Sequence, residues 1–198
     1  MDAPSPARQP ASHPDGRKQR SERSRLAIVD AMLELIMDGT MEPSAAEIAE
    51  RAGVSARTVF RHFEEMDTLY CEMTERMEAQ IMPIIQQPFT GEGWQSQLDQ
   101  LLERRAAIYE RIMPLKIAAS IRRFSSQYLM VNYQRFLHLE RTGLENVLPE
   151  AVRRNVAQFS AIEMCAGFQT WRRLRQDQDL TTEQATEVVK LAIAKLLA

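Results

Sequence analysis

Residues 44–63 of the chain read SAAEIAERAGVSARTVFRHF, and this pattern predicts two short helices that meet at a sharp turn. Ser44 and Glu47 have the spacing of a capping box, in which each residue satisfies a backbone N–H of the other at a helix start. Gly53 can adopt the left-handed conformation that a sharp turn needs, and Ser55 is placed to cap the second helix. Two short helices joined in this way are typical of a helix-turn-helix.

Basic and hydrogen-bonding residues gather on this unit and just before it. Residues 51–62 contain no acid, and residues 17–25 contain five basic residues against one acid. The whole chain has a net charge of −2, so this local concentration of positive charge stands out from the rest. A plain corner between two helices has the same apolar pattern, but the basic residues favour an anionic partner such as nucleic acid.

The segment AEIAERAGVSARTVFRHFEEMDTLY, residues 46–70, resembles the DNA-binding signature of the TetR/AcrR transcriptional regulators. The resemblance covers about residues 20–80 and implies a recognition helix over residues 55–62 that enters the major groove, with residues 17–25 contacting the DNA backbone or minor groove. Phe60 stands where the family usually has tyrosine, and Met66 stands where it usually has a lysine that contacts the backbone. Because Met66 is neutral, we expect residues 17–25 to supply more of the affinity than in relatives that keep the lysine.

The residues expected to contact DNA are Arg17, Lys18, Arg20, Arg23, Arg25, Ser44, Ser55, Ala56, Arg57, Thr58, Phe60, Arg61 and His62. Arg57 and Arg61 lie four residues apart on one helix face, where each can bind guanine or a phosphate. The partner predicted by the resemblance is a palindromic operator in double-stranded DNA, bound by a homodimer.

Composition predicts an all-α fold. The 198 residues are 44% hydrophobic with only seven glycines, they are rich in strong helix formers, and they lack the alternating pattern of β-strands. We expect a disordered tail over residues 1–16, a three-helix DNA-binding domain with its connecting helix over 17–82, and a C-terminal helical ligand-binding and dimerisation domain over 83–198. Helices are expected over about residues 21–37, 44–52, 56–63, 66–82, 94–113, 116–123, 126–145, 149–175 and 181–197, with interruptions at Pro83 and Pro114.

The last two helices present apolar residues at helical spacing. An internal core explains this pattern, but the family resemblance implies a four-helix dimer interface formed by Val152, Val156, Phe159, Val188, Val189, Ala192 and Leu196.

Large apolar side chains are unusually dense in the middle helices. Taken alone such a density indicates core packing, whereas the resemblance implies a cavity for a small apolar or amphipathic inducer. The expected lining residues are Tyr109, Ile112, Met113, Phe124, Tyr128, Tyr133, Phe136, Leu137, Met164, Phe168 and Trp171.

Other classes of function are less well supported. The chain has no nucleophile elbow, zinc-protease motif or phosphate-binding loop, so we expect no catalysis, no metal and no cofactor. Cys71 and Cys165 favour two reduced thiols, although a single bridge stays possible. We expect no membrane span, no secretory signal and a cytoplasmic location. The predicted function is a ligand-released repressor, and the alternative is a helical ligand-binding or adaptor protein with a vestigial DNA-binding head.

Overall fold

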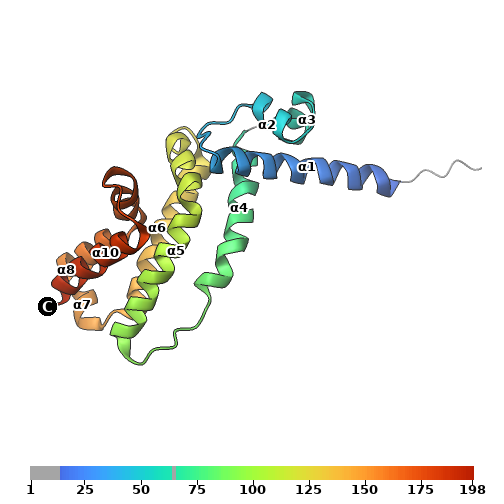
Figure 1. Cartoon of the computed structure of the whole chain (residues 1–198). Coiled ribbons are helices and arrows are strands. Elements are labelled where there is room, and N and C mark those ends of the chain that lie inside the picture. The colour runs from blue at the N-terminus through green and yellow to red at the C-terminus, as the bar shows by residue number, and fades with distance from the viewer. Residues whose placement is uncertain (1–13, 64–65) are drawn as a thin grey trace, which may run out of the picture.

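A computed structural model describes residues 14–63 and 66–198, and every regular element in these residues is helical. The molecule is elongated, with the N-terminal helices near one end and the last helices at the other (Figure 1). The predicted all-α fold, a helix-turn-helix unit followed by a helical C-terminal part, is therefore confirmed. In chain order the elements are α1 (Pro14–Met37), α2 (Ala45–Arg51), α3 (Ala56–His62), α4 (Met66–Ile85), α5 (Gly93–Arg122), α6 (Gln127–Val147), α7 (Glu150–Arg154), α8 (Val156–Ala166), α9 (Phe168–Arg172), the π-helical turn η1 (Arg173–Asp177) and α10 (Thr182–Leu197).

Helices α1, α2 and α3 pack around a shared apolar core at the N-terminal end. α1 contributes Ile28, Met32 and Ile36, α2 contributes Ile48 and α3 contributes Val59, and all five side chains are buried. This packing fixes the orientation of α2 and α3 on α1, so the outer face of α3 is held in one position.

The local signals in residues 44–63 behave as predicted. The Ser44 hydroxyl accepts the Glu47 N–H at 3.2 Å, and the Glu47 carboxylate accepts the Ser44 N–H at 2.8 Å. Gly53 has φ +65°, and Ser55 caps α3 by accepting the Thr58 N–H at 3.2 Å. The turn geometry therefore follows from residues that are adjacent in the sequence.

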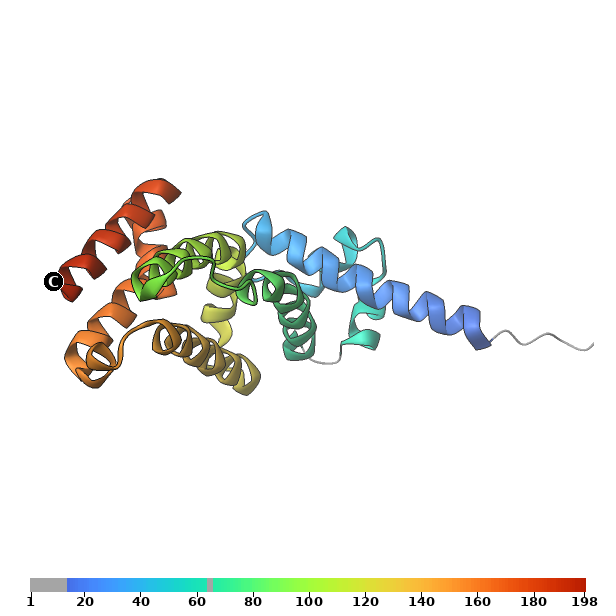
Figure 2. The same ribbon diagram turned by 90° about the horizontal axis from the view of Figure 1, so that it is seen from below.

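Helix α1 begins earlier than predicted. It starts at Pro14 rather than near residue 21, because proline is tolerated in the first turn of a helix, where its missing N–H needs no partner. Of the predicted tail over residues 1–16, residues 1–13 lie outside the described residues, and residues 14–16 belong to this helix. The N-terminal part of α1 projects beyond α2 and α3 (Figure 2).

Two prolines that were predicted to interrupt helices lie inside them. α4 continues past Pro83 to Ile85, and α5 continues past Pro114, so the separate helix predicted over residues 116–123 does not exist. In α5 the side chains on both sides of Pro114 are buried, Ile112 before it and Ala118 after it. Packing of both halves against the same core outweighs the loss of one backbone hydrogen bond.

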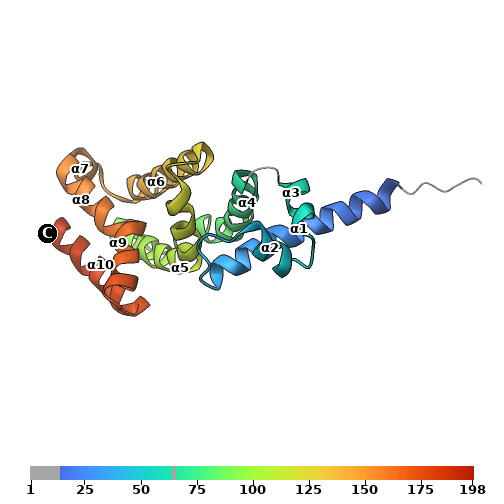
Figure 3. The ribbon, with the colours of Figure 1, turned by 90° about the horizontal axis from the view of Figure 1, so that it is seen from above.

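The segment predicted as one helix over residues 149–175 is divided in two places. Asn155 ends α7 and caps α8 by accepting the Gln158 N–H at 3.1 Å. Gly167 is extended between α8 and α9. These breaks redirect the chain so that α8 lies beside α10 at the end of the molecule (Figure 3).

Helix α5 is the central element of the C-terminal part. It packs against α1 and α4 on the side of the N-terminal head and against α6, α9 and α10 on the other side. Cys71 in α4 and Cys165 in α8 are both free thiols. The head and the C-terminal helices are thus joined through one long helix and through α4.

Candidate DNA-binding surface and ligand cavity

Helix α3 presents a polar and basic face to solvent. Ala56, Arg57 and Arg61 are exposed. Phe60 is 57% exposed, which is a large exposed fraction for an aromatic side chain. Val59, on the opposite side of the helix, is buried in the core. The face that sequence reasoning selected is therefore the face that points outward.

The hydroxyl residues at the helix starts are exposed but already take part in capping. Ser44 Oγ lies 2.6 Å from the Glu47 carboxylate, and Ser55 Oγ lies 2.9 Å from the half-buried Thr58 hydroxyl. A hydroxyl can accept and donate at once, so these groups remain compatible with a phosphate contact.

His62 is less accessible than the other predicted residues. Its ring lies 6.5 Å from the Phe63 ring, and its Nε2 atom is buried without a hydrogen-bond partner in the described residues. Burial lowers the pKa of His62, and the neighbouring charges of Arg61 and Arg25 lower it further. His62 is therefore neutral near pH 7, and its ring packs at the end of α3.

The basic residues before the head lie on the projecting part of α1. Lys18, Arg20 and Arg23 are exposed, and the Arg20 guanidinium donates to the Gly16 carbonyl at 3.1 Å. Arg17 belongs to the same helix, but its side chain lies outside the described residues. We call Lys18, Arg20 and Arg23 the basic arm. This part of the predicted cationic segment is thus helical, and these three side chains point outward.

Arg25 differs from the basic arm because its guanidinium is engaged inside the molecule. It forms an ion pair with Glu72 of α4, donates to the His62 carbonyl at 3.2 Å and lies 4.7 Å from the centre of the Phe63 ring. This side chain joins α1, α3 and α4. The sequence gives no sign of this role, since the partner carboxylate is 47 positions away.

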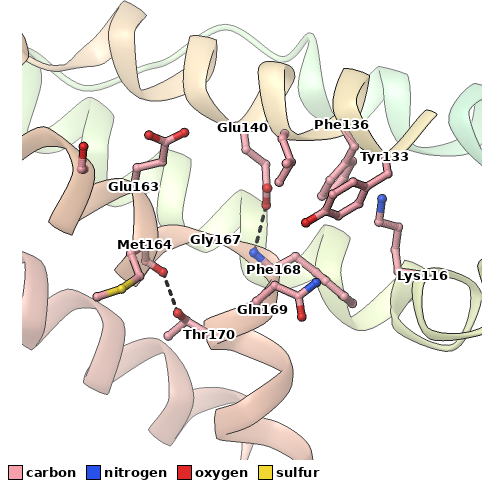
Figure 4. Close-up of a pocket in the computed structure, with 12 residues that line it drawn as sticks. Lys116, Tyr133, Phe136, Glu140, Glu163, Met164, Gly167, Phe168, Gln169 and Thr170 are labelled. Atoms are coloured by element: carbon pink, nitrogen blue, oxygen red, sulfur yellow. Dashed lines mark hydrogen bonds between the residues drawn. The ribbon is translucent and has the colours of Figure 1, made fainter. Parts of the chain in front are cut away.

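A cavity of about 330 Å³ lies between α5, α6, α8 and α9 (Figure 4). Five of the predicted lining residues border it: Tyr133, Phe136, Leu137, Met164 and Phe168. The other six lie elsewhere, with Tyr109, Trp171, Ile112 and Met113 in the core, Tyr128 against α4, and Phe124 78% exposed at the end of α5. The predicted residues come largely from helices that border this cavity, but the sequence could not separate its lining residues from the core beneath them.

A polar network that sequence reasoning missed forms one wall of the cavity. The Glu140 carboxylate accepts hydrogen bonds from the Tyr109 hydroxyl and, at 3.0 Å, from the Phe168 N–H. The Tyr109 hydroxyl also lies 3.1 Å from the Ala166 carbonyl, which accepts a bond from Arg105 at 3.2 Å. Burial raises the pKa of Glu140 above its ordinary value. The network ties α5, α6 and the α8–α9 junction together behind the cavity.

Lys116 is the second missed feature. Its ammonium group lines the cavity and lies 3.6 Å from the centre of the Phe136 ring and 5.9 Å from that of Tyr133. Burial lowers the pKa of Lys116 to about 8, although Glu140 and Glu78 act in the opposite direction. A lysine on a helix is so often a surface residue that nothing in the sequence marks it as a lining residue.

The surfaces of α8 and α10 contain the residues predicted at a dimer interface. Val156 and Val188 are exposed, Val152, Ala192 and Leu196 are half-buried, and Phe159 and Val189 lie in the core of the protomer. Leu191, which was not predicted, is 62% exposed beside Val188 on α10. Three exposed apolar residues therefore lie on these two helices, Val156 on α8 and Val188 and Leu191 on α10, and we call them the apolar strip.

Comparison with known proteins agrees with the geometry of the head. Residues 28–73 match the bacterial regulatory proteins of the tetR family. The head is therefore a TetR-family domain. The crystal structure of a transcriptional regulator from Rhodococcus sp. Rha1 is similar, with a TM-score of 0.64 and 20% sequence identity over 89% of this chain and 95% of that one. At this identity the likeness concerns the fold. No curated protein matches the chain.

The family assignment gives the head its general role. The matched domain is that of bacterial regulatory proteins, so the head has the fold of a regulator's DNA-binding unit. In the part of the chain that the structure describes, no helix combines the length and the apolar character needed to cross a membrane.

Proposed function

We propose that this TetR-family protein is a ligand-responsive repressor that binds a palindromic operator as a dimer and is released by a small apolar or amphipathic ligand. The observation that carries the proposal is the position of α4, which follows the helix-turn-helix in the chain, packs against α1 and also packs against α6, the helix that borders the cavity. We assign residues 17–82 to DNA binding and residues 83–198 to regulation and dimerisation. We place the protein in the cytoplasm, where a bacterial chromosome is accessible.

The DNA contacts are assigned to α3 and to the basic arm. Arg57 and Arg61 are exposed on α3 and have the planar guanidinium groups that bind guanine edges or phosphates in the major groove. Lys18, Arg20 and Arg23 are exposed on the part of α1 that projects beyond α2 and α3 (Figure 2), so they are assigned to phosphates outside the reach of α3. Arg25 is not assigned to this surface, because its guanidinium is already bonded to Glu72 and to the His62 carbonyl.

Dimerisation is assigned to the apolar strip of α8 and α10. Val156, Val188 and Leu191 are exposed on α8 and α10, and these two helices lie at the end of the molecule away from α1 (Figure 1). A two-fold pairing of these helices buries the strip and presents two α3 helices to half-sites about one helical turn apart, roughly 34–36 Å.

Release is assigned to contacts between α6 and α4. α6 borders the cavity through Tyr133. Other side chains at its start and in its middle contact α4. Ser126 donates to Asp67 at 2.6 Å, and Arg135 forms an ion pair with Glu78. A ligand that shifts α6 therefore acts on the helix that follows the head. To weaken operator binding tenfold, the ligand must favour the displaced form by about 1.4 kcal/mol.

Selection of bound sites from a pool of random DNA duplexes tests the proposal. The enriched sequences should contain a palindrome whose half-sites are about one helical turn apart. The selected duplex should then form a complex with an even number of protomers in analytical ultracentrifugation. Enrichment of an asymmetric site bound by a single protomer contradicts the dimeric operator assignment.

A further inference from the structure

Two cations lie close to the cavity, Lys116 of α5 and Arg123, the residue that follows the last turn of this helix. Lys116 borders the cavity itself, and both Lys116 and Arg123 border a small adjoining recess of about 20 Å³. Tyr133, Phe168 and Gln169 also line both spaces, so the recess opens from the cavity. The larger space is mainly apolar, and Lys116 is the one basic residue among the described residues that line it.

These cations differ from the other charged groups of the cavity because they have no carboxylate partner. Among residues 14–63 and 66–198, no carboxylate oxygen lies within 4.0 Å of Lys116 or Arg123. The Arg123 guanidinium lies 4.2 Å from the centre of the Tyr133 ring, and its Nε atom is buried without a hydrogen-bond partner. Among the described residues the charged groups of Lys116 and Arg123 contact aromatic rings and no carboxylate, so each can still form an ion pair with a bound anion.

The carboxylates of the cavity are already satisfied. Glu163 is paired with Arg141 at 2.6 Å, and Glu140 accepts hydrogen bonds from the Tyr109 hydroxyl and the Phe168 N–H. A cationic ligand would have to compete with these partners and would meet the positive charge of Lys116. An anionic group would meet donors that are not in use.

We infer that the ligand of this cavity is an anionic amphiphile, a carboxylate on an apolar or aromatic body, whose acid group binds Lys116 with support from Arg123. This inference rests on the proposed ligand-responsive function and specifies the chemistry of its ligand. The body lies against Phe136, Phe168 and Met164, and the volume of about 330 Å³ suits a small molecule.

Isothermal titration calorimetry with three matched probes tests the inference. The probes are 4-phenylbutyrate, 4-phenylbutanol and 4-phenylbutylamine, which share one apolar body and differ in charge. The full-length protein should bind the acid at least tenfold more tightly than the alcohol, and the amine most weakly. A desolvated ion pair that only the acid forms is the physical reason for this order.

Variants assign the preference to the named side chains. Lys116→Met should remove the advantage of the acid while leaving the affinity for the alcohol unchanged or higher, and Arg123→Gln should reduce that advantage. The matched control is Lys190→Met, since Lys190 contacts Glu103 at 2.8 Å and does not line the cavity. Lys116→Gln, which keeps a polar side chain, provides a second variant, and circular dichroism verifies that each variant is folded.

The inference is overturned if the alcohol or the amine binds as tightly as the acid, if the acid does not bind the folded protein, or if its advantage survives in Lys116→Met. Fluorescence anisotropy with the selected operator separates this result from the proposed function. Preferred binding of the acid without release of DNA refutes ligand-driven release but leaves the ligand class standing. If the alcohol or the amine releases DNA in preference to the acid, the inferred ligand class is refuted, but ligand-driven release stands.

Discussion

Arg25 and Arg61 have the same side chain, but their surroundings give them different roles. Arg25 is held by Glu72, by the His62 carbonyl and against Phe63, so removing its charge should disturb the packing of α1, α3 and α4. Arg61 is exposed on α3, so removing its charge should leave the fold unchanged. Residue type and position in the chain predicted a cationic surface, but only the tertiary contacts show which arginines can reach a ligand.

Lys116 should be a source of instability in the ligand-free protein. Its folded pKa is about 8 and its ordinary pKa is 10.5, so between these pH values the unfolded chain binds more protons than the folded one. Lys116 therefore makes the free energy of unfolding of the wild type rise with pH across this interval. The destabilisation is fully present below pH 8 and is lost as the pH approaches 10.5.

We therefore expect Lys116→Met to be more stable than the wild type at pH 7, by up to about 3 kcal/mol, and the difference to shrink as the pH rises to about 10. Urea unfolding of both proteins at several pH values measures this difference, and titrating groups that do not interact with Lys116 cancel. Glu140, Glu78 and Arg123 act on Lys116 and are present in both. A variant that is no more stable at pH 7, or whose advantage does not change with pH, contradicts the account of Lys116.

The local signals of the sequence determine some elements more completely than others. The helix-turn-helix was predictable because its caps and turn depend on neighbours such as Ser44, Glu47 and Gly53. Pro114 was misleading because the cost of a proline inside a helix is local, whereas the packing that outweighs it comes from helices far away in the sequence. For the same reason the sequence identified the helices around the cavity but not Lys116, whose unpaired state depends on how α6 and α9 cover it.

The basic arm on α1 should contribute to affinity through phosphates rather than through bases. Replacing Lys18, Arg20 and Arg23 by glutamine should weaken binding to all duplexes alike. The slope of the logarithm of the binding constant against the logarithm of salt concentration should fall by about 0.9 for each phosphate that the variant no longer neutralises.

The salt dependence of fluorescence anisotropy with specific and random duplexes measures this effect. The matched control replaces three exposed arginines outside the head, Arg111, Arg153 and Arg173, and should leave the slope unchanged. If the arm variant keeps the wild-type slope, the arm does not compensate for the neutral Met66.

The elongated shape of the molecule separates its proposed activities along one axis. The DNA-binding face lies near one end, the apolar strip of α8 and α10 lies at the other, and the cavity lies between them beside α6. The long helices α4 and α5 connect these regions, so the proposed release needs a change at the cavity to pass through only a few side-chain contacts.

Leu191→Glu should convert the protein to a monomer without unfolding it. Leu191 is 62% exposed on α10, so a charge there costs the protomer little but opposes burial against a second copy. Sedimentation velocity measures the change, and circular dichroism verifies the fold. The control is Ile121→Glu, which adds the same charge to an exposed apolar position of α5 away from the strip. An unchanged dimer in Leu191→Glu, or an equal effect of Ile121→Glu, places the interface elsewhere.

The most direct test of the central claim is the affinity of the full chain for duplex DNA, measured by fluorescence anisotropy over a range of salt concentrations. We predict tight binding at low salt that weakens steeply as salt rises, because the basic side chains displace counterions from phosphates. Arg61→Ala should cost specific binding about 1–3 kcal/mol if the side chain binds a base edge, with a smaller loss on random duplex. A folded protein that does not bind duplex at low salt, or that binds it independently of salt and of Arg57 and Arg61, contradicts the account.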